Sequence, residues 1–147
     1  PESAGERVIA KVCGELGREG KAYNGGFYDY PENGAKTVWP ELRKLYGKSD
    51  VNISHDDIKD RILFRQVIES IKCLEENVLR TVRDGNIGSI FGIGAPPWTG
   101  GFLQFVNTYG LDNFIARSSE LAELYGDRFN PPKLLLDKAA KGELFVD

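Results

Sequence analysis

The sequence contains no methionine, one histidine and two cysteines among its 147 residues. Because an open reading frame begins with methionine, we expect a chain without one to have been trimmed or taken from a longer polypeptide. The first residues, PESAGERV, show no basic segment followed by an apolar core, so we expect no secretory signal. No apolar run approaches the roughly 20 residues that a transmembrane helix requires, so we expect no membrane span.

The chain also lacks any concentration of positive charge. Its Lys and Arg residues are scattered, and its formal net charge is -3. A protein that binds nucleic acid or an anionic membrane usually gathers basic residues on one surface, so we expect neither partner. The apolar fraction of 41% and the charged fraction of 28% are typical of a globular protein, and the length fits one domain with an extension.

Few residues are suited to chemistry. Cys13 and Cys73 have no His or Cys neighbours, which predicts buried free thiols rather than a metal site. His55 lies among acidic residues and is a candidate general base, but its place at a helix start favours a solvated residue in the first turn. The acidic residues have places at helix ends or on exposed faces, so we assign none of them a catalytic role. None shows the spacing of a calcium-binding loop, so we expect no metal site.

Apolar residues repeat at helical spacing in several segments, which predicts a mainly α-helical chain. The clearest helix covers residues 56–79, and Ser54 is expected to cap it by accepting from the N–H of Asp57. Residues 21–34 alternate poorly and predict an extended strap rather than a paired strand. The apolar stripe of the long helix consists of Ile58, Ile62, Leu63, Val67, Ile71, Leu74 and Val78. The other predicted helices cover residues 4–16, 40–46, 87–92, 102–109, 112–125 and 132–141.

The segment 89–110, SIFGIGAPPWTGGFLQFVNTYG, is dense in Gly, Pro and aromatic residues and contains no Asp, Glu, His, Lys, Arg or Cys. It lacks the third glycine and the preceding strand of a dinucleotide-binding fingerprint, so we do not expect it to hold a phosphate. Its glycines and prolines favour a tight, buried turn between two helices. Its apolar residues and its glycines, which permit close backbone approach, also make Pro97, Trp98, Gly100 and Gly101 candidates for a contact with another domain or with the apolar part of a ligand.

Several separated motifs carry a family resemblance. They are Cys73-Leu74-Glu75-Glu76, the run GIGAPPWTGGFLQFVNTYG, Tyr125-Gly126 and Pro131-Pro132. In this order they resemble the C-terminal helical part of the 3-hydroxyacyl-CoA dehydrogenase family, in particular the multifunctional enzymes of fatty-acid β-oxidation. The resemblance implies an all-α fold like the C-terminal helical domain of 6-phosphogluconate dehydrogenase, with an extended N-terminal strap. It also implies that residues 1–50 hold the tail of a first helical repeat, the strap and a linker, and that residues 51–147 form a second repeat.

Enzymes of this family oxidise the 3-hydroxyl group of an acyl-CoA with NAD, using a His–Glu pair and a Rossmann domain that precede the helical region. This chain has no strand followed by G-x-G-x-x-G, and His55 does not match the family's catalytic motif. The resemblance therefore implies a structural module that helps to form the substrate cleft or a dimer contact, is not catalytic alone and binds no cofactor itself, NAD being held by the parent enzyme.

The resemblance implies partners as well. They are an N-terminal Rossmann domain in the same polypeptide, with or without an enoyl-CoA hydratase domain, the acyl-CoA substrate, and a second copy in a homodimer. The implied location is the cytoplasm of a bacterium or the matrix of an organelle. Two alternatives stay open: a free-standing helical protein that keeps the fold and binds a helix or a lipid-like ligand, and a small enzyme that uses His55 and would lose its activity on His55→Ala.

Overall fold

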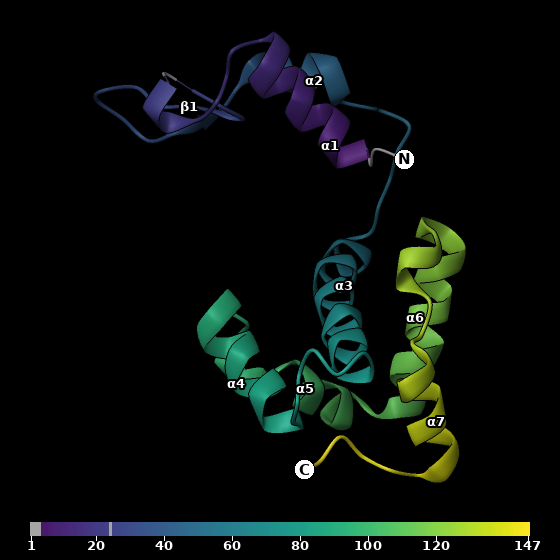
Figure 1. The fold of residues 1–147 in the computed structure, drawn as a ribbon. Coiled ribbons are helices and arrows are strands. Elements are labelled where there is room, and N and C mark those ends of the chain that lie inside the picture. The colour runs from purple at the N-terminus through teal and green to yellow at the C-terminus, as the bar shows by residue number, and fades with distance from the viewer. Residues whose placement is uncertain (1–3, 24) are drawn as a thin grey trace. The chain divides into compact units, whose positions relative to one another are not determined.

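The computed structural model describes residues 4–23 and 25–147, and the predictions that include residues 1–3 and 24 lie outside the described residues at those positions. Helices predominate in the described part (Figure 1), which confirms the predicted all-α class. The chain divides into two compact units, Pro1–Asn52 and Ile53–Asp147. The assignment of residues 1–50 to the tail of a first repeat, the strap and a linker, and of residues 51–147 to a second repeat, stays a prediction.

The first unit begins with α1 (Ala4–Ile9), which continues as a π-helix, η1 (Ala10–Glu15). Gly17, with a φ of +65°, follows the helix, as the sequence predicted. Val12 is the buried residue of this segment, and Ile9 remains 53% exposed. A short 3-10 helix, η2 (Lys21–Tyr23), and later α2 (Pro40–Tyr46) complete the helices of this unit. The predicted bounds of α2 are confirmed.

The prediction of an unpaired strap is wrong in part, because β1 (Tyr28–Asp29) pairs with β2 (Thr37–Val38) in an antiparallel ladder. The side chain of Arg18 organises this turn. Its Nε donates to the carbonyl oxygen of Gly26 at 2.8 Å, and its guanidinium lies 4.3 Å from the ring centroid of Trp39 and forms an ion pair with Asp29. These contacts join residues far apart in the sequence, so hydrophobic periodicity does not reveal them.

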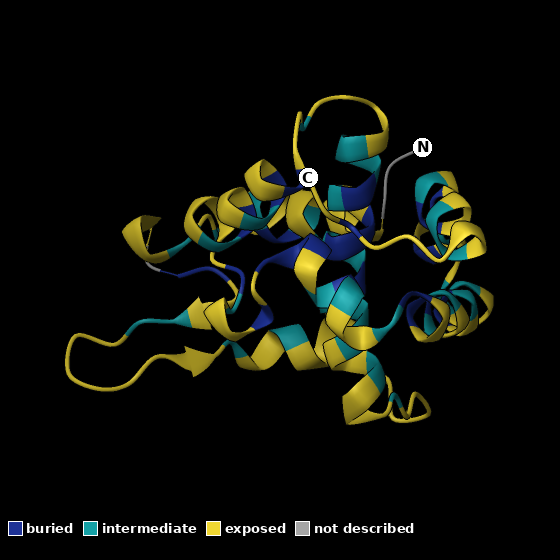
Figure 2. Cartoon of the chain, turned by 90° about the horizontal axis from the view of Figure 1, so that it is seen from below, coloured by how far each residue is buried: buried dark blue, intermediate teal, exposed yellow. Residues whose placement is uncertain are grey.

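The second unit holds five α-helices among its described residues. They are α3 (His55–Glu75), α4 (Val82–Ile93), α5 (Phe102–Tyr109), α6 (Leu111–Tyr125) and α7 (Lys133–Lys141), with short 3-10 helices η3 (Pro97–Thr99) and η4 (Asp127–Phe129) between them. Bands of buried and exposed residues alternate along these helices (Figure 2), as amphipathic helices require. Helix α5 has the predicted bounds, and α6 and α7 begin within one residue of theirs.

Helix α3 starts as predicted, because the Oγ of Ser54 accepts from the N–H of Asp57 at 3.0 Å. It ends four residues before the predicted end. Asn77 adopts a left-handed conformation with a φ of +59°, and the N–H groups of Val78 and Leu79 both donate to the carbonyl oxygen of Cys73. The chain therefore leaves the helix axis although Val78 and Leu79 continue the apolar spacing.

The predicted stripe of α3 is correct in its middle and wrong at its ends. Val67 and Ile71 are fully buried, whereas Ile62 is 62% exposed and Val78 is 69% exposed. Phe64, which the predicted stripe omitted, lies in the core, and its ring stacks on Phe114 of α6 with the centroids 4.2 Å apart. The core-facing residues of α3 are Phe64, Val67, Ile68 and Ile71, a set with helical spacing.

The last residues of the chain fold back onto the helices. Asn107 of α5 holds Phe145 at both backbone groups, since its Nδ2 donates to the carbonyl oxygen and its Oδ1 accepts from the N–H, each at 2.9 Å. The Phe145 ring is 1% exposed and belongs to the core. Among the described residues, none of the helices combines the length and the apolar character needed to cross a lipid bilayer.

Candidate functional site

The glycine-rich and proline-rich segment forms a corner between α4 and α5, and two glycines allow the helices to approach closely. A Cβ at Gly85 would lie 2.7 Å from a side-chain carbon of Leu103, and a Cβ at Gly101 would lie 2.4 Å from the Cα of Asn86. Gly101 also has a φ of +102°, a conformation that L-residues rarely adopt. Gly101 therefore requires glycine for reasons internal to the chain, whereas a larger residue at Gly85 would have to displace the side chain of Leu103.

Side chains occupy all four backbone donors at the start of α5. The N–H of Gly101 donates to the Oγ1 of Thr99 at 3.1 Å, and the N–H of Phe102 donates to the Oγ of Ser89 at 3.1 Å. The next two N–H groups, at positions 103 and 104, both donate to the Oδ1 of Asn86, at 3.0 and 2.9 Å. A helix start can hold a phosphate through its free N–H groups, and here each of these groups has a protein acceptor.

The candidate contact residues lie in different surroundings. Trp98 is 77% exposed, Pro97 and Gly100 are exposed, and Gly101 is buried against Asn86. Only Trp98 of these residues lines the neighbouring apolar groove of about 570 Å³, which we name the Trp98 groove. The residues that line it come from α3, the corner and α5: Lys59, Asp60, Ile62, Leu63, Gln66, Gly94, Ala95, Pro96, Trp98, Phe102 and Phe105. The predicted contact of Pro97, Trp98, Gly100 and Gly101 with another domain stays a prediction.

A polar network ties α3 to α6 beside this groove, and the sequence did not predict it. Arg117 binds Asp57 through Nη2 at 2.5 Å and Asp60 through Nε at 2.8 Å. The hydroxyl of Tyr125 donates to Asp57 at 2.6 Å. This bond and the one from Arg117 hold the pKa of the Asp57 carboxyl below its usual value. Arg117 also binds Glu120 of its own helix through Nη1 at 3.1 Å, so three carboxylates hold this arginine, and two of them join α6 to α3.

The hydrogen bonds to Asp57 also change the pKa of its partners. The pKa of Tyr125 is raised, first because its hydroxyl donates to the Asp57 carboxylate and then because of burial. The pKa of Arg117 is raised by its bond to the same carboxylate, so the guanidinium stays charged at any physiological pH. The network is therefore a fixed set of charges. The acidic pair at positions 57 and 60, three residues apart on α3, was the signal in the sequence that could have pointed to it.

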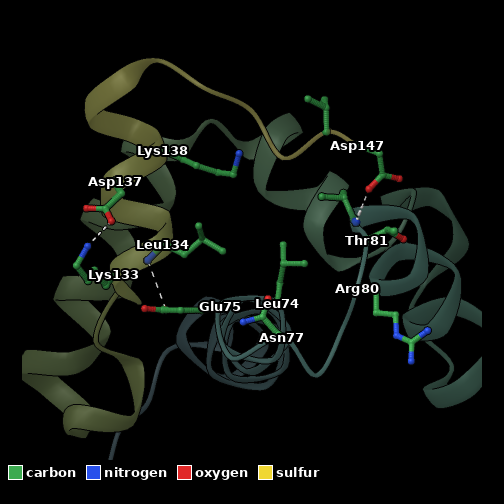
Figure 3. A pocket seen from close by; sticks show the side chains of 12 residues that line it. Leu74, Glu75, Asn77, Arg80, Thr81, Lys133, Leu134, Asp137, Lys138 and Asp147 are labelled. Carbon is green, nitrogen blue, oxygen red and sulfur yellow. Dashed lines mark hydrogen bonds and ion pairs between the residues drawn. The ribbon is translucent and has the colours of Figure 1, made fainter.

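A second pocket, of about 610 Å³, is lined mainly by the end of α3, the start of α4, the start of α7 and the C-terminal residues (Figure 3). Asp147 accepts from the N–H of Val82 at 2.6 Å, and Glu75 accepts from the N–H of Leu134 at 3.4 Å. Each carboxylate thus lies at the positive end of a helix dipole, where negative charge is stabilised. These two acids therefore stabilise the starts of α4 and α7.

The structure also places the histidine and the two cysteines that the sequence offered as candidates for chemistry. His55 is exposed in the first turn of α3. Cys13 and Cys73 are free thiols, as predicted, although both are only partly buried. Within residues 4–23 and 25–147, the His, Cys, Asp and Glu side chains form no group of three or more that could hold a metal ion.

The chain is similar in sequence to a protein of known function. No protein-family model matches it. Over 134 residues it is 38% identical to the fatty acid oxidation complex subunit alpha of Vibrio vulnificus strain CMCP6. The resemblance to the multifunctional 3-hydroxyacyl-CoA dehydrogenases is confirmed. The match includes 89% of this chain and 19% of the alpha subunit, so the chain spans about a fifth of the length of the relative it matches.

Proposed function

We propose that this chain is a structural module of an NAD-dependent 3-hydroxyacyl-CoA dehydrogenase of fatty-acid β-oxidation, and that it shapes the substrate cleft or a dimer contact without catalysing hydride transfer. The observation that carries the proposal is the 38% identity to a fatty acid oxidation complex alpha subunit over 89% of the chain. The geometry of the α4–α5 corner supports it, because the polar groups there bind one another and Trp98 remains exposed.

The partners belong to the same proposal. They are a Rossmann domain that binds NAD, with or without an enoyl-CoA hydratase domain, in the same polypeptide, the acyl-CoA that reaches the cleft between domains, and a second copy of the chain. The Trp98 groove is the surface we assign to the neighbouring domain, since an exposed tryptophan beside an apolar groove is typical of the centre of an interface. We propose a cytoplasmic location in a bacterium or the matrix of an organelle.

Two measurements test this function. An antibody raised against the chain should detect a native polypeptide several times larger than 16.4 kDa. The isolated chain should not oxidise a 3-hydroxyacyl-CoA with NAD, whereas the native polypeptide should. A native polypeptide of the chain's own size would contradict the proposal and favour a free-standing helical binding protein.

A pair of variants tests the docking surface. Trp98→Ala should weaken the association of the chain with the nucleotide-binding part of its polypeptide at least tenfold, because the central aromatic residue of an interface carries much of its binding energy. The matched control is Leu124→Ala on α6, where the side chain is 65% exposed and lies outside the groove. Equal binding of both variants and the unchanged chain, measured by calorimetry, would exclude the Trp98 groove as the contact.

A further inference from the structure

A pocket of about 330 Å³ between α3 and η4 gathers three arginines, and we name it the arginine pocket. The residues that line it are Ile58, Arg61, Ile62, Arg65, Arg128 and Phe129. The first four belong to α3 and have the spacing of one helical face, and the last two belong to η4. Three lining residues are cationic, three are apolar and none is acidic. Such a lining suits a ligand with an anionic part and an apolar part.

The positive charge of the pocket is not balanced within the chain. Arg65 forms an ion pair with Glu69 at 2.6 Å. Neither Arg61 nor Arg128 forms an ion pair with another residue of the described ranges 4–23 and 25–147. Like charges four residues apart destabilise a helix, and Arg61 and Arg65 are such a pair. A bound anion would offset this repulsion.

Aromatic rings hold two of the guanidinium groups in place. The guanidinium of Arg61 lies 4.3 Å from the ring centroid of Tyr125, and that of Arg128 lies 4.9 Å from the ring centroid of Phe129. The Nη1 of Arg65 donates to the carbonyl oxygen of Arg128 at 3.4 Å, which joins α3 to η4. A guanidinium stacked on a ring keeps the N–H groups at its edge, where they can bind a phosphate or carboxylate in a bidentate manner.

The apolar wall explains two residues that the packing of α3 leaves exposed. Ile62 is 62% exposed and Ile58 is 42% exposed, although the apolar spacing of the helix predicted both to be buried. Both lie in the wall of the arginine pocket, beside Arg61 in the sequence or one turn from it. Covering this apolar surface is favourable. A ligand that places an apolar group on these isoleucines therefore binds more tightly than a bare anion.

Size and charge favour a small organic phosphate. Pockets for small molecules have volumes of about 300–1,000 Å³, and this one lies near the lower end. A phosphate monoester carries about two negative charges and three acceptor oxygens at neutral pH, enough for two guanidinium groups. The chain as a whole has a net charge of -3, so a long polyanion would meet repulsion away from the pocket.

We propose that the arginine pocket binds a small organic phosphate. Arg61 and Arg128 hold the phosphate group, and Ile58 and Ile62 contact the apolar group next to it. Arg65 fixes the two walls relative to each other through its bond to the backbone of Arg128. The proposal rests on this pocket alone, and not on the proposed role of the chain in an enzyme.

Titration of the whole 147-residue chain with phenyl phosphate, followed through the backbone amide signals in nuclear magnetic resonance spectra, tests the proposal. The signals that shift should belong to α3 and η4 around the pocket. Arg61→Gln and Arg128→Gln should each weaken the binding at least about tenfold, because hydrogen bonds between charged groups are the strong ones. The matched control is Arg83→Gln, which removes the same charge from a side chain that is 76% exposed and lies outside the pocket. It should leave the affinity unchanged.

Two further probes separate the two parts of the ligand. Inorganic phosphate should bind more weakly than phenyl phosphate, and phenol should not bind. Ile58→Ala should weaken the binding of phenyl phosphate about threefold or more, because less apolar surface is covered, and should not change the binding of inorganic phosphate. The mutated side chains are exposed or only partly buried, so the variants should fold, which circular dichroism checks.

Three results would overturn the proposal. The first is the absence of shifts with phenyl phosphate up to about 20 mM. The second is equal weakening by Arg83→Gln and Arg128→Gln, which would show a general attraction by charge. The third is tighter binding of inorganic phosphate than of phenyl phosphate, which would remove the apolar wall from the site. These titrations use neither NAD nor an acyl-CoA, so the failure of this proposal and the failure of the proposed function can be recognised separately.

Discussion

Replacing Asn86 by alanine should destabilise the second unit more than the replacement of a partly buried asparagine usually does. Its Oδ1 accepts from the N–H groups of Leu103 at 3.0 Å and Gln104 at 2.9 Å, so alanine removes the acceptor of two donors at once. Loss of a helix cap costs about 0.5–2 kcal/mol. A buried N–H left without an acceptor costs about 1–3 kcal/mol, and Leu103 is fully buried. We therefore expect a loss of about 2–4 kcal/mol in the free energy of unfolding.

Urea unfolding followed by far-ultraviolet circular dichroism measures this loss. The control is Asn113→Ala, since the amide of Asn113 makes one exposed bond of 3.3 Å to the carbonyl oxygen of Tyr109 and its loss should cost less than about 0.5 kcal/mol. Asn86→Asp keeps the acceptor and adds negative charge at the start of α5, so it should recover most of the stability. A loss of less than about 1 kcal/mol for Asn86→Ala, or equal losses for both alanine variants, would refute the reasoning.

Two further predictions concern the glycines near α4 and the stability of the chain at low pH. Gly101→Ala should lower the free energy of unfolding by about 2–5 kcal/mol, because its Cβ would lie 2.4 Å from the Cα of Asn86. Gly88→Ala should raise the free energy of unfolding by about 0.5–1 kcal/mol, because a Cβ there has open space and alanine favours the helix. Equal shifts in the melting temperatures of the two variants would contradict this prediction. Asp57 has a lowered pKa because Tyr125 donates to it, so its contribution is present above the ordinary aspartate pKa of about 3.9 and is lost as the pH falls through the lowered value. Tyr125→Phe should therefore reduce the fall in stability below about pH 4, and an unchanged acid profile would argue against this role.

Local signals in the sequence were sufficient to predict the helices with clear ends. Helix α2 begins at Pro40 and is followed by Gly47, and α5 lies between Gly101 and Gly110. Proline at a helix start and glycine after a helix end act through the backbone of their own segment. The end of α3 was missed because Asn77 interrupts an apolar pattern that continues beyond it. Asn adopts the left-handed conformation more readily than most residues, and the N–H groups of Val78 and Leu79 then close the helix end on the carbonyl oxygen of Cys73.

The candidate site was predictable only in part, and the reason lies in how far apart its partners are in the sequence. Asn86 and the backbone of Leu103 are 17 residues apart, and Arg117 and Asp57 are 60 residues apart. Whether such groups meet depends on how two helices cross, and apolar spacing predicts which face is buried without predicting the crossing. Trp98 was named from the sequence as a candidate contact residue, a role that stays a prediction, whereas the capping role of Asn86 was not predicted.

The capped start of α5 limits what the corner can contribute to binding. Its N–H groups and the side-chain oxygens of Asn86, Ser89 and Thr99 satisfy one another, so a partner can gain little from hydrogen bonds there. What remains to be gained is the burial of apolar surface. Trp98 is 77% exposed, and burial of an area on the order of 200 Å² at about 25 cal/mol per Å² amounts to about 5 kcal/mol before the costs of association. Trp98 is therefore the residue of the corner whose truncation should weaken a domain contact most, and a small effect of Trp98→Ala would mean that the corner serves only the internal packing of α4 against α5.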